Sequence, residues 1–206
     1  MNFTHYAATK SATIPYTVEL CLRTPAQCAE YEDKTTFDAL CKNGCPNYAR
    51  KWSCPPFAPS FADFTGHWKN LYVIFMHTEL AEFSYIKNSY LKVKAANSVL
   101  KSRADRFTRR MAELHGSYIS TGSCRLCKSC KCKGGAPCAH PASMSYSFEA
   151  LGIDVNQMVT DCFQKPLLWY RKSCAPRYTS VVCGILTNEE LSLEYLRDAC
   201  QMYVIS

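Results

Sequence analysis

Fourteen of the 206 residues are cysteines, and the densest group of them lies between residues 122 and 141. Cys124, Cys127 and Cys130 are separated by two residues each, and seven residues separate Cys130 from Cys138. Thiolates at successive two-residue intervals wrap one loop around three corners of an iron–sulfur cube, and a more distant cysteine closes the fourth corner. The spacing therefore predicts a [4Fe–4S] cluster on these four cysteines.

Other interpretations of this segment stay open. Zinc more often takes its ligands as separated C-x₂-C pairs, so zinc is the alternative metal. Cys132 is an additional thiol, and spacing alone does not settle which of Cys130, Cys132 and Cys138 fill the last two corners, although Cys130 and Cys138 are preferred. Basic residues alternate with the cysteines, and no acid lies between residues 125 and 141. These cations suit an anionic cluster. They also suit a solvent-exposed zinc-knuckle loop that contacts nucleic acid.

Earlier in the chain lies another group of cysteines, Cys41, Cys45 and Cys54, spaced by three and eight residues. We call these three the first group and the cysteines of residues 122–141 the second group. Asn43-Gly44 favours a turn and Pro46 disfavours helix at Cys45, so the segment 41–56 is predicted to be a loop. Three thiolates on a [4Fe–4S] cube would leave one iron open to a substrate, a small ligand or a remote residue. The alternatives are zinc with His67 as the fourth ligand, a fourth ligand from Cys21 or Cys28, and one site shared with the second group.

Positive charge is concentrated in one stretch of the chain. The formal net charge is +7, and the segment 87–110 has eight basic residues against a single acid, Asp105. Apolar residues recur there at helical spacing, so a long helix is predicted over 86–115, with Lys94, Lys101 and Arg109 on its outer face. An acidic redox-partner protein could dock on this helix. Sequence-specific nucleic-acid binding is not expected, because no RNP or helix-turn-helix pattern accompanies the charge.

The elements that must position these cysteines are those of an α+β protein. We predict a single compact domain over residues 1–206, in which helices pack on a small mixed sheet that carries two metal loops, 41–56 and 122–141. Residues 1–40 are expected to be irregular apart from one strand. The expected elements are strands near 16–22, 71–77, 118–120 and 179–186, and helices near 61–68, 86–115, 154–164 and 189–203.

Three motifs in order, CPNYARKWSCPPFAPS, GSCRLCKSCKC followed by PCAHP, and SFEALGIDV, resemble an uncharacterised family of small cysteine-rich predicted metal-binding proteins. That family is found mainly in anaerobic bacteria and archaea. The resemblance covers about residues 41–155 and implies that the metal ligands are the seven cysteines of the two groups: Cys41, Cys45, Cys54, Cys124, Cys127, Cys130 and Cys138. Cys132 is not part of the family pattern.

These features favour a protein that binds one or two [4Fe–4S] clusters and has an electron-transfer or redox-partner role. An enzyme that uses the open three-cysteine site for small-molecule or sulfur chemistry is the first alternative, and a zinc-stabilised binding module is the second. The longest purely apolar run, residues 71–76, is far shorter than the ~20 residues of a membrane span. The N-terminal segment lacks the apolar core of a secretion signal, so a cytoplasmic protein with no membrane association is expected.

Overall fold

A computed structural model describes residues 1–171 and 174–205 of the chain. Within this part the chain forms one compact α+β domain around a five-stranded sheet with the strand order β1-β2-β3-β5-β4. Every neighbouring pair of these strands is antiparallel. The predicted fold class is confirmed, and the sheet is antiparallel throughout rather than mixed. The strands are β1 (Asn2–Ala8), β2 (Thr13–Arg23), β3 (Asn70–Glu79), β4 (Gly116–Ile119) and β5 (Tyr178–Thr187).

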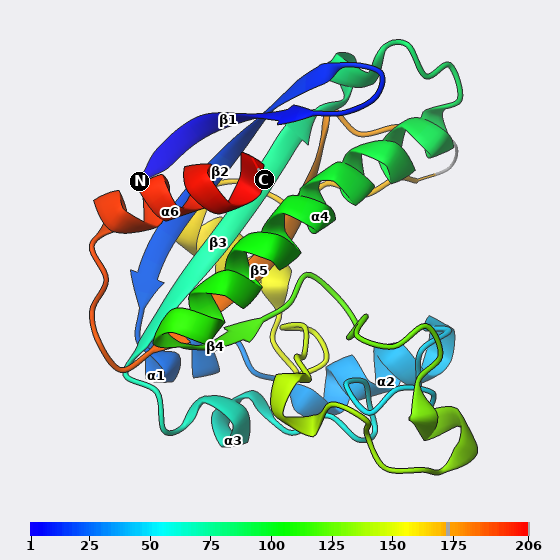
Figure 1. Ribbon diagram of the computed structural model, residues 1–206. Helices are drawn as coiled ribbons and strands as arrows, with labels where there is room; N and C mark the ends of the chain where they lie inside the picture. Colours follow the sequence, from blue (N-terminus) through cyan, green and yellow to red (C-terminus); the bar gives the residue numbers. More distant parts are fainter. Residues whose placement is uncertain (172–173, 206) are drawn as a thin grey trace.

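Helices cover both faces of the sheet. Two of them, α4 (Ser89–His115) and α6 (Leu193–Ile205), lie across one face, where α4 runs diagonally over the strands (Figure 1). Leu100 and Phe107 of α4 are fully buried in one core with Ile74 of β3 and Ile185 of β5. The opposite face carries α1 (Pro25–Ala29), α3 (Phe61–Thr65) and α5 (Val155–Phe163), whose buried side chains share a second core with alternate residues of β3.

The central strand β3 is buried on both sides, which explains its continuous apolar sequence. Tyr72 and Ile74 point into the core under α4, whereas Val73 and Phe75 point into the core under α5. A strand with one solvated face would instead alternate apolar and polar residues. The strand predicted near 71–77 is therefore confirmed, and it is the central strand of the sheet.

Side-chain caps mark the starts of three of the predicted helices, although α3 ends three residues before its predicted end and α4 begins three residues after its predicted start. Ser60 accepts a hydrogen bond from the backbone of Asp63 at the start of α3, and Asp154 caps α5 through Gln157. Asn88 caps α4, which ends at His115 with Gly116 as its C-cap. These side chains satisfy backbone N–H groups that have no partner within the first helical turn.

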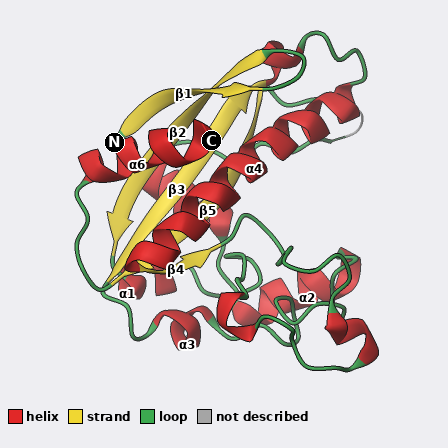
Figure 2. Cartoon of the chain, in the orientation of Figure 1, coloured by secondary structure: helices red, strands yellow, loops and turns green. Residues whose placement is uncertain are grey.

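The expectation of an irregular N-terminal segment is wrong. Residues 1–40 contain β1, all of β2, α1 and the first part of α2 (Lys34–Gly44). Strand β1 pairs along its whole length with β2 at the edge of the sheet. Helix α2 lies beside the loops that follow it, in the region of the molecule where loop predominates over regular structure (Figure 2).

Candidate metal centre

The loop that carries the second cysteine group starts at the end of β4 and is held near that strand by backbone contacts. Ser120 directly follows β4, and its backbone N–H donates to the carbonyl of Tyr146, where the chain returns from the loop. The hydroxyl of Ser120 donates to the same carbonyl and to the carbonyl of Gly122. The hydrogen bonds of Ser120 thus close the base of a long loop that contains all five cysteines between residues 122 and 141.

The four cysteines preferred as ligands face one common space. Cys124, Cys127, Cys130 and Cys138 all line a single cavity of about 20 Å³. Three side chains of the loop 51–53, together with Leu126, His140 and Met144, complete its wall, and no carboxylate lines it. Thiols up to 14 positions apart in the sequence therefore line the same cavity.

Cys132 does not line this cavity. Its buried thiol lies 3.9 Å from the backbone carbonyl oxygen of Ala49, in the loop of the first cysteine group. Burial raises the pKa of the Cys132 thiol, and the nearby Cys130 raises it further. The spacing of the sequence left a choice among Cys130, Cys132 and Cys138, and only the other two line the cavity.

Hydrogen bonds connect the loop of the first cysteine group to the loop of the second group. The ammonium group of Lys51 donates to the carbonyl of Cys124 (2.9 Å) and to the hydroxyl of Ser123 (3.0 Å). The hydroxyl of Ser53, which is buried, accepts a hydrogen bond from the backbone N–H of Cys124 (3.0 Å). Lys51 and Ser53 were not singled out from the sequence, because nothing local shows that they reach a loop seventy residues away.

Trp52 adds a third contact between the two loops. Its indole N–H donates to the carbonyl of Ala136 (3.0 Å), and its ring packs against Phe57 with 4.7 Å between the ring centroids. The aromatic residues that follow Phe57 in the chain belong to the core instead. Phe61 is buried in the core under α5, and Phe64 and Trp68 pack against that core.

The first cysteine group is spread over a helix end and a loop. Cys41 lies in the last turn of α2, and Cys45 caps that helix in an extended conformation, with its N–H bonded to the carbonyl of Cys41. The prediction of a loop was correct for Cys45 and wrong for Cys41, because Pro46 constrains only the residue directly before it. Cys54 is buried.

Cys45 lies close enough to Cys41 and Cys54 to affect the pKa of both thiols. Burial, with smaller contributions from Cys45 and Cys41, raises the pKa of Cys54 to about 11, although the hydrogen bond with Ser53 and the charge of Lys51 act in the opposite direction. Burial also raises the pKa of Cys41, followed by the charge of Cys45. Such mutual repulsion is relieved when thiolates bind a cation.

The proposed reserve ligands of the first group have other neighbours. His67 is exposed and packs against Trp68 with 4.8 Å between ring centroids. Cys21 and Cys28 lie on the face of the sheet that α5 covers, in the same core region as Cys162. Neither the histidine nor these two cysteines has a described contact with the first group.

The donor set of the second group fits a thiolate-bound metal centre. Four sulfur donors are the usual ligands of iron–sulfur clusters and of structural zinc. Among the described residues, no three His, Cys, Asp or Glu side chains are already close enough to form a single-ion site. A cavity of about 20 Å³ has room for about one water molecule. A cluster would therefore require the exposed loop, which has only the short turns η2 (Lys131–Gly134) and η3 (Pro141–Ser143), to expand.

The predicted outer face of the basic helix needs correction. Lys94 is exposed, but Lys101 and Arg109 are half-buried, and the Nε atom of Arg109 is enclosed by protein. The helix turns these two residues toward the chain segments after β4. The exposed cations of this region are Lys87, Lys94, Arg106 and Arg110.

A group of cysteines outside both motifs forms a thiol pair that the sequence did not reveal. A hydrogen bond from Cys21 on β2 lowers the pKa of the Cys162 thiol on α5, and the guanidinium group of Arg23 lowers it further. The same hydrogen bond and burial raise the pKa of Cys21. Burial raises the pKa of neighbouring Cys28 to about 12. These residues are far apart in sequence, so no spacing could have indicated the pair.

Cys162 is therefore expected to be the reactive member of this group. Because the thiolate is the nucleophile, iodoacetamide at pH 7 should alkylate Cys162 much faster than Cys28, whose raised pKa keeps it protonated. Replacing Arg23 by glutamine removes one stabilising partner of the thiolate, raises the pKa of Cys162 and slows its alkylation at that pH. Mass spectrometry of the labelled peptides measures both rates, with Arg106→Gln as the control. Equal labelling of Cys162 and Cys28 would contradict the assignment.

The fold and the site define a single-domain, cysteine-rich α+β protein with thiol donors gathered on two adjoining loops. The chain belongs to the family described as predicted metal-binding protein (DUF2284), whose model matches residues 24–183. That range contains all seven cysteines proposed as ligands, and the membership supports metal binding as the general function. No curated protein and no solved structure matches the chain. In the described part of the chain, no helix has the length and apolar character of a membrane span.

Proposed function

We propose that the protein binds a [4Fe–4S] cluster through Cys124, Cys127, Cys130 and Cys138 and has an electron-transfer or redox-partner role. The observation that carries this proposal is that these four thiols, and not Cys132, line one cavity. Their sequence spacing supports a cluster over zinc, since three ligands follow one another at two-residue intervals. A bound cluster would supply reversible one-electron transfer.

The residues around the cavity suit an anionic centre. A [4Fe–4S]²⁺ core with four thiolates has a net charge of about −2, which nearby cations stabilise. Arg125, Lys128, Lys131 and Lys133 all lie on the exposed side of the loop, and Lys51 is hydrogen-bonded to the carbonyl of the ligand candidate Cys124. The hydrogen bonds of Lys51 and Ser53 hold the backbone at Cys124 in place. This reduces the movement of the protein when the charge of a bound cluster changes on oxidation or reduction.

The metal content of the purified protein tests this proposal. The protein is purified without oxygen, and iron, acid-labile sulfide and zinc are measured per chain, together with the visible absorption spectrum and the electron paramagnetic resonance signal after reduction. Iron and sulfide in equal amounts, with a signal on reduction, would support the cluster. A colourless protein with stoichiometric zinc and no iron would overturn it and favour the zinc-stabilised module.

We further propose that Cys41, Cys45 and Cys54 hold a second metal centre. The observation that favours it is that the end of α2 places Cys41 and Cys45 next to each other, and that Cys45 lies near enough to Cys41 and Cys54 to contribute to the raised pKa of both thiols. A three-thiolate cluster would keep one iron available for inner-sphere chemistry, which is the enzyme alternative.

Replacing Cys45 by serine is expected to lower the metal content by one centre while the 124–138 centre remains. If the second centre has an open iron, cyanide or a small thiol should shift the magnetic resonance signal of the wild type and of Cys127→Ser, and not that of Cys45→Ser. A Cys45→Ser variant with unchanged metal content would show that this group holds no metal.

A further inference from the structure

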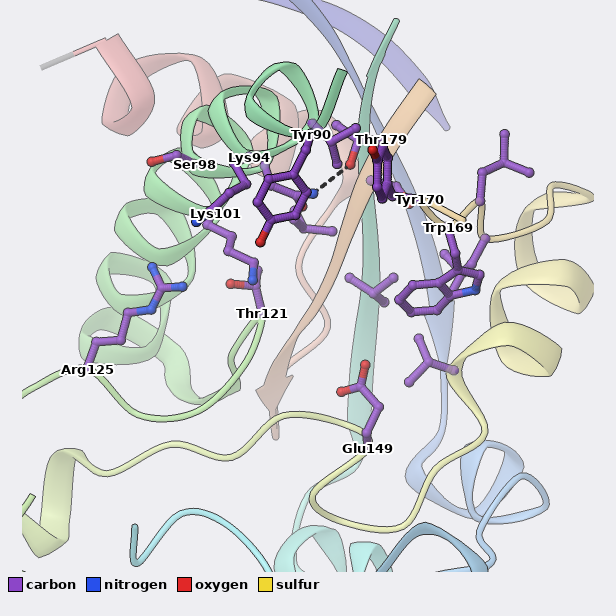
Figure 3. A pocket seen from close by; sticks show the side chains of 18 residues that line it. Tyr90, Lys94, Ser98, Lys101, Thr121, Arg125, Glu149, Trp169, Tyr170 and Thr179 are labelled. Atoms are coloured by element: carbon purple, nitrogen blue, oxygen red, sulfur yellow. Dashed lines mark hydrogen bonds between the residues drawn. The ribbon is translucent and has the colours of Figure 1, made fainter. Parts of the chain in front are cut away.

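A cavity of about 630 Å³ lies between α4, β5 and the segment 167–170 (Figure 3). Its volume falls within the range of small-molecule sites, roughly 300–1,000 Å³. Asn97 of α4 donates a hydrogen bond to the hydroxyl of Thr179 on β5 (2.8 Å), which connects two of its walls. No function proposed above uses this cavity.

Aromatic rings line the upper and outer part of the cavity. Tyr90 of α4 and Tyr170 lie with their ring centroids 5.6 Å apart, and Trp169, the neighbour of Tyr170 in the chain, extends toward the interior from the wall opposite α4 (Figure 3). Tyr90 is 51% exposed and Trp169 is 59% exposed. Large aromatic side chains that remain exposed at a concave site provide stacking surface for a planar ligand.

Cationic side chains lie at the lower end of the cavity, beneath the rings. Lys101 of α4 and Arg125 of the cysteine loop both line it, with the carboxylate of Glu149 on the floor (Figure 3). Burial lowers the pKa of Lys101 and the neighbouring charge of Arg125 lowers it further, whereas the carboxylates of Glu149 and Asp105 act in the opposite direction. Neither forms an ion pair with a carboxylate within the described chain. Two unpaired neighbouring cations in a cavity attract an anionic group.

The edge of the sheet contributes backbone groups to the same cavity. Strand β4 pairs with β5 only over residues 184–187 of β5, so residues 179–182, which line the cavity, have no strand partner on that side in the described chain. An unpaired strand edge presents N–H and C=O groups that can bind the polar substituents of a ligand.

We propose that this cavity binds a small planar aromatic molecule with one anionic substituent, a carboxylate or a phosphate. The ring lies among Tyr90, Trp169 and Tyr170, and the anion lies between Lys101 and Arg125. The site does not depend on the metal proposal, because none of its lining residues is a proposed ligand. Arg125 directly follows Cys124, so the ligand would lie beside the loop of the proposed metal centre.

Isothermal titration calorimetry with three matched compounds tests both halves of the site. Naphthalene-2-carboxylate has the ring and the charge, naphthalene-2-methanol has the ring alone, and decahydronaphthalene-2-carboxylate has the charge alone. The aromatic carboxylate is expected to bind at least about tenfold more tightly than either partial analogue, a difference of about 1.4 kcal/mol. Adenosine 5′-monophosphate, titrated in parallel, distinguishes a preference for phosphate from one for carboxylate.

Variants assign the binding to this cavity. The double change Lys101→Met and Arg125→Gln should reduce affinity for the aromatic carboxylate to that of the neutral alcohol, and Trp169→Leu should weaken both naphthalene compounds. Arg106→Gln, on the exposed side of α4, is the matched control and should change neither. Circular dichroism verifies that each variant is folded. Failure of every anionic aromatic compound to bind, or unchanged affinity in the double variant, would overturn the proposal whatever the metal content.

Discussion

Serine in place of Cys127 is expected to abolish metal binding at the 124–138 group and to lower the iron content by about four atoms per chain. Cys127 lines the cavity together with the other three proposed ligands. A serine hydroxyl is a poor substitute for a thiolate toward iron, and three remaining thiolates hold a cluster less firmly. The stability of the domain should fall as well, because metal binding to such loops is coupled to their folding.

Matched cysteine variants make this result specific. Cys132→Ser removes a thiol from the same loop, but that thiol contacts Ala49 and not the cavity, so the iron content should be unchanged. Cys174→Ser removes an exposed thiol outside both groups and controls for general effects of oxidation. Iron and sulfide are measured per chain for each variant. Full iron content in Cys127→Ser, or its loss in Cys132→Ser, would show that the ligands are assigned wrongly.

The elements with strong apolar periodicity or clear caps could be predicted from the sequence. Strand β3 and helix α4 lie close to their predicted positions, because core packing imposes a pattern on them. Helix α2 has no buried residue, so no apolar stripe marked it. Strand β1 is an edge strand in which only His5 and Ala7 are buried. Its alternation of apolar and polar residues is therefore too weak to distinguish it from an irregular segment.

The features of the site that depend on neighbouring residues could also be predicted from the sequence, whereas those that depend on distant segments could not. The spacing of Cys124, Cys127 and Cys130 is local and was recognisable, whereas the bracing by Lys51 and Ser53 depends on how two distant loops meet. The thiol pair of Cys21 and Cys162 joins β2 to α5 across one face of the sheet. Contacts of this kind follow from the fold as a whole and leave no periodic trace in the sequence.

Gly116 connects α4 to β4, and replacing it by alanine is expected to lower the free energy of unfolding by about 3 kcal/mol. A Cβ atom at this position would lie 2.3 Å from the carbonyl oxygen of Leu186 and 2.7 Å from Cζ3 of Trp68. The first contact is with the backbone of β5, so it cannot be relieved by a side-chain rotation. Gly116 pairs with Thr187 in the sheet, which fixes its position.

The same substitution should also disturb the metal centre, because β4 leads within a few residues to Cys124. A displaced β4 would move Ser120, whose hydrogen bonds close the base of the cysteine loop. Denaturant unfolding measures the stability, and iron content measures the site. Gly122→Ala is the matched control, since no atom lies within 4 Å of its Cβ position, and its stability should change by less than about 0.5 kcal/mol. Equal stabilities for the two variants would show that the α4–β4 junction tolerates a side chain and that the close approach to Leu186 does not constrain the fold.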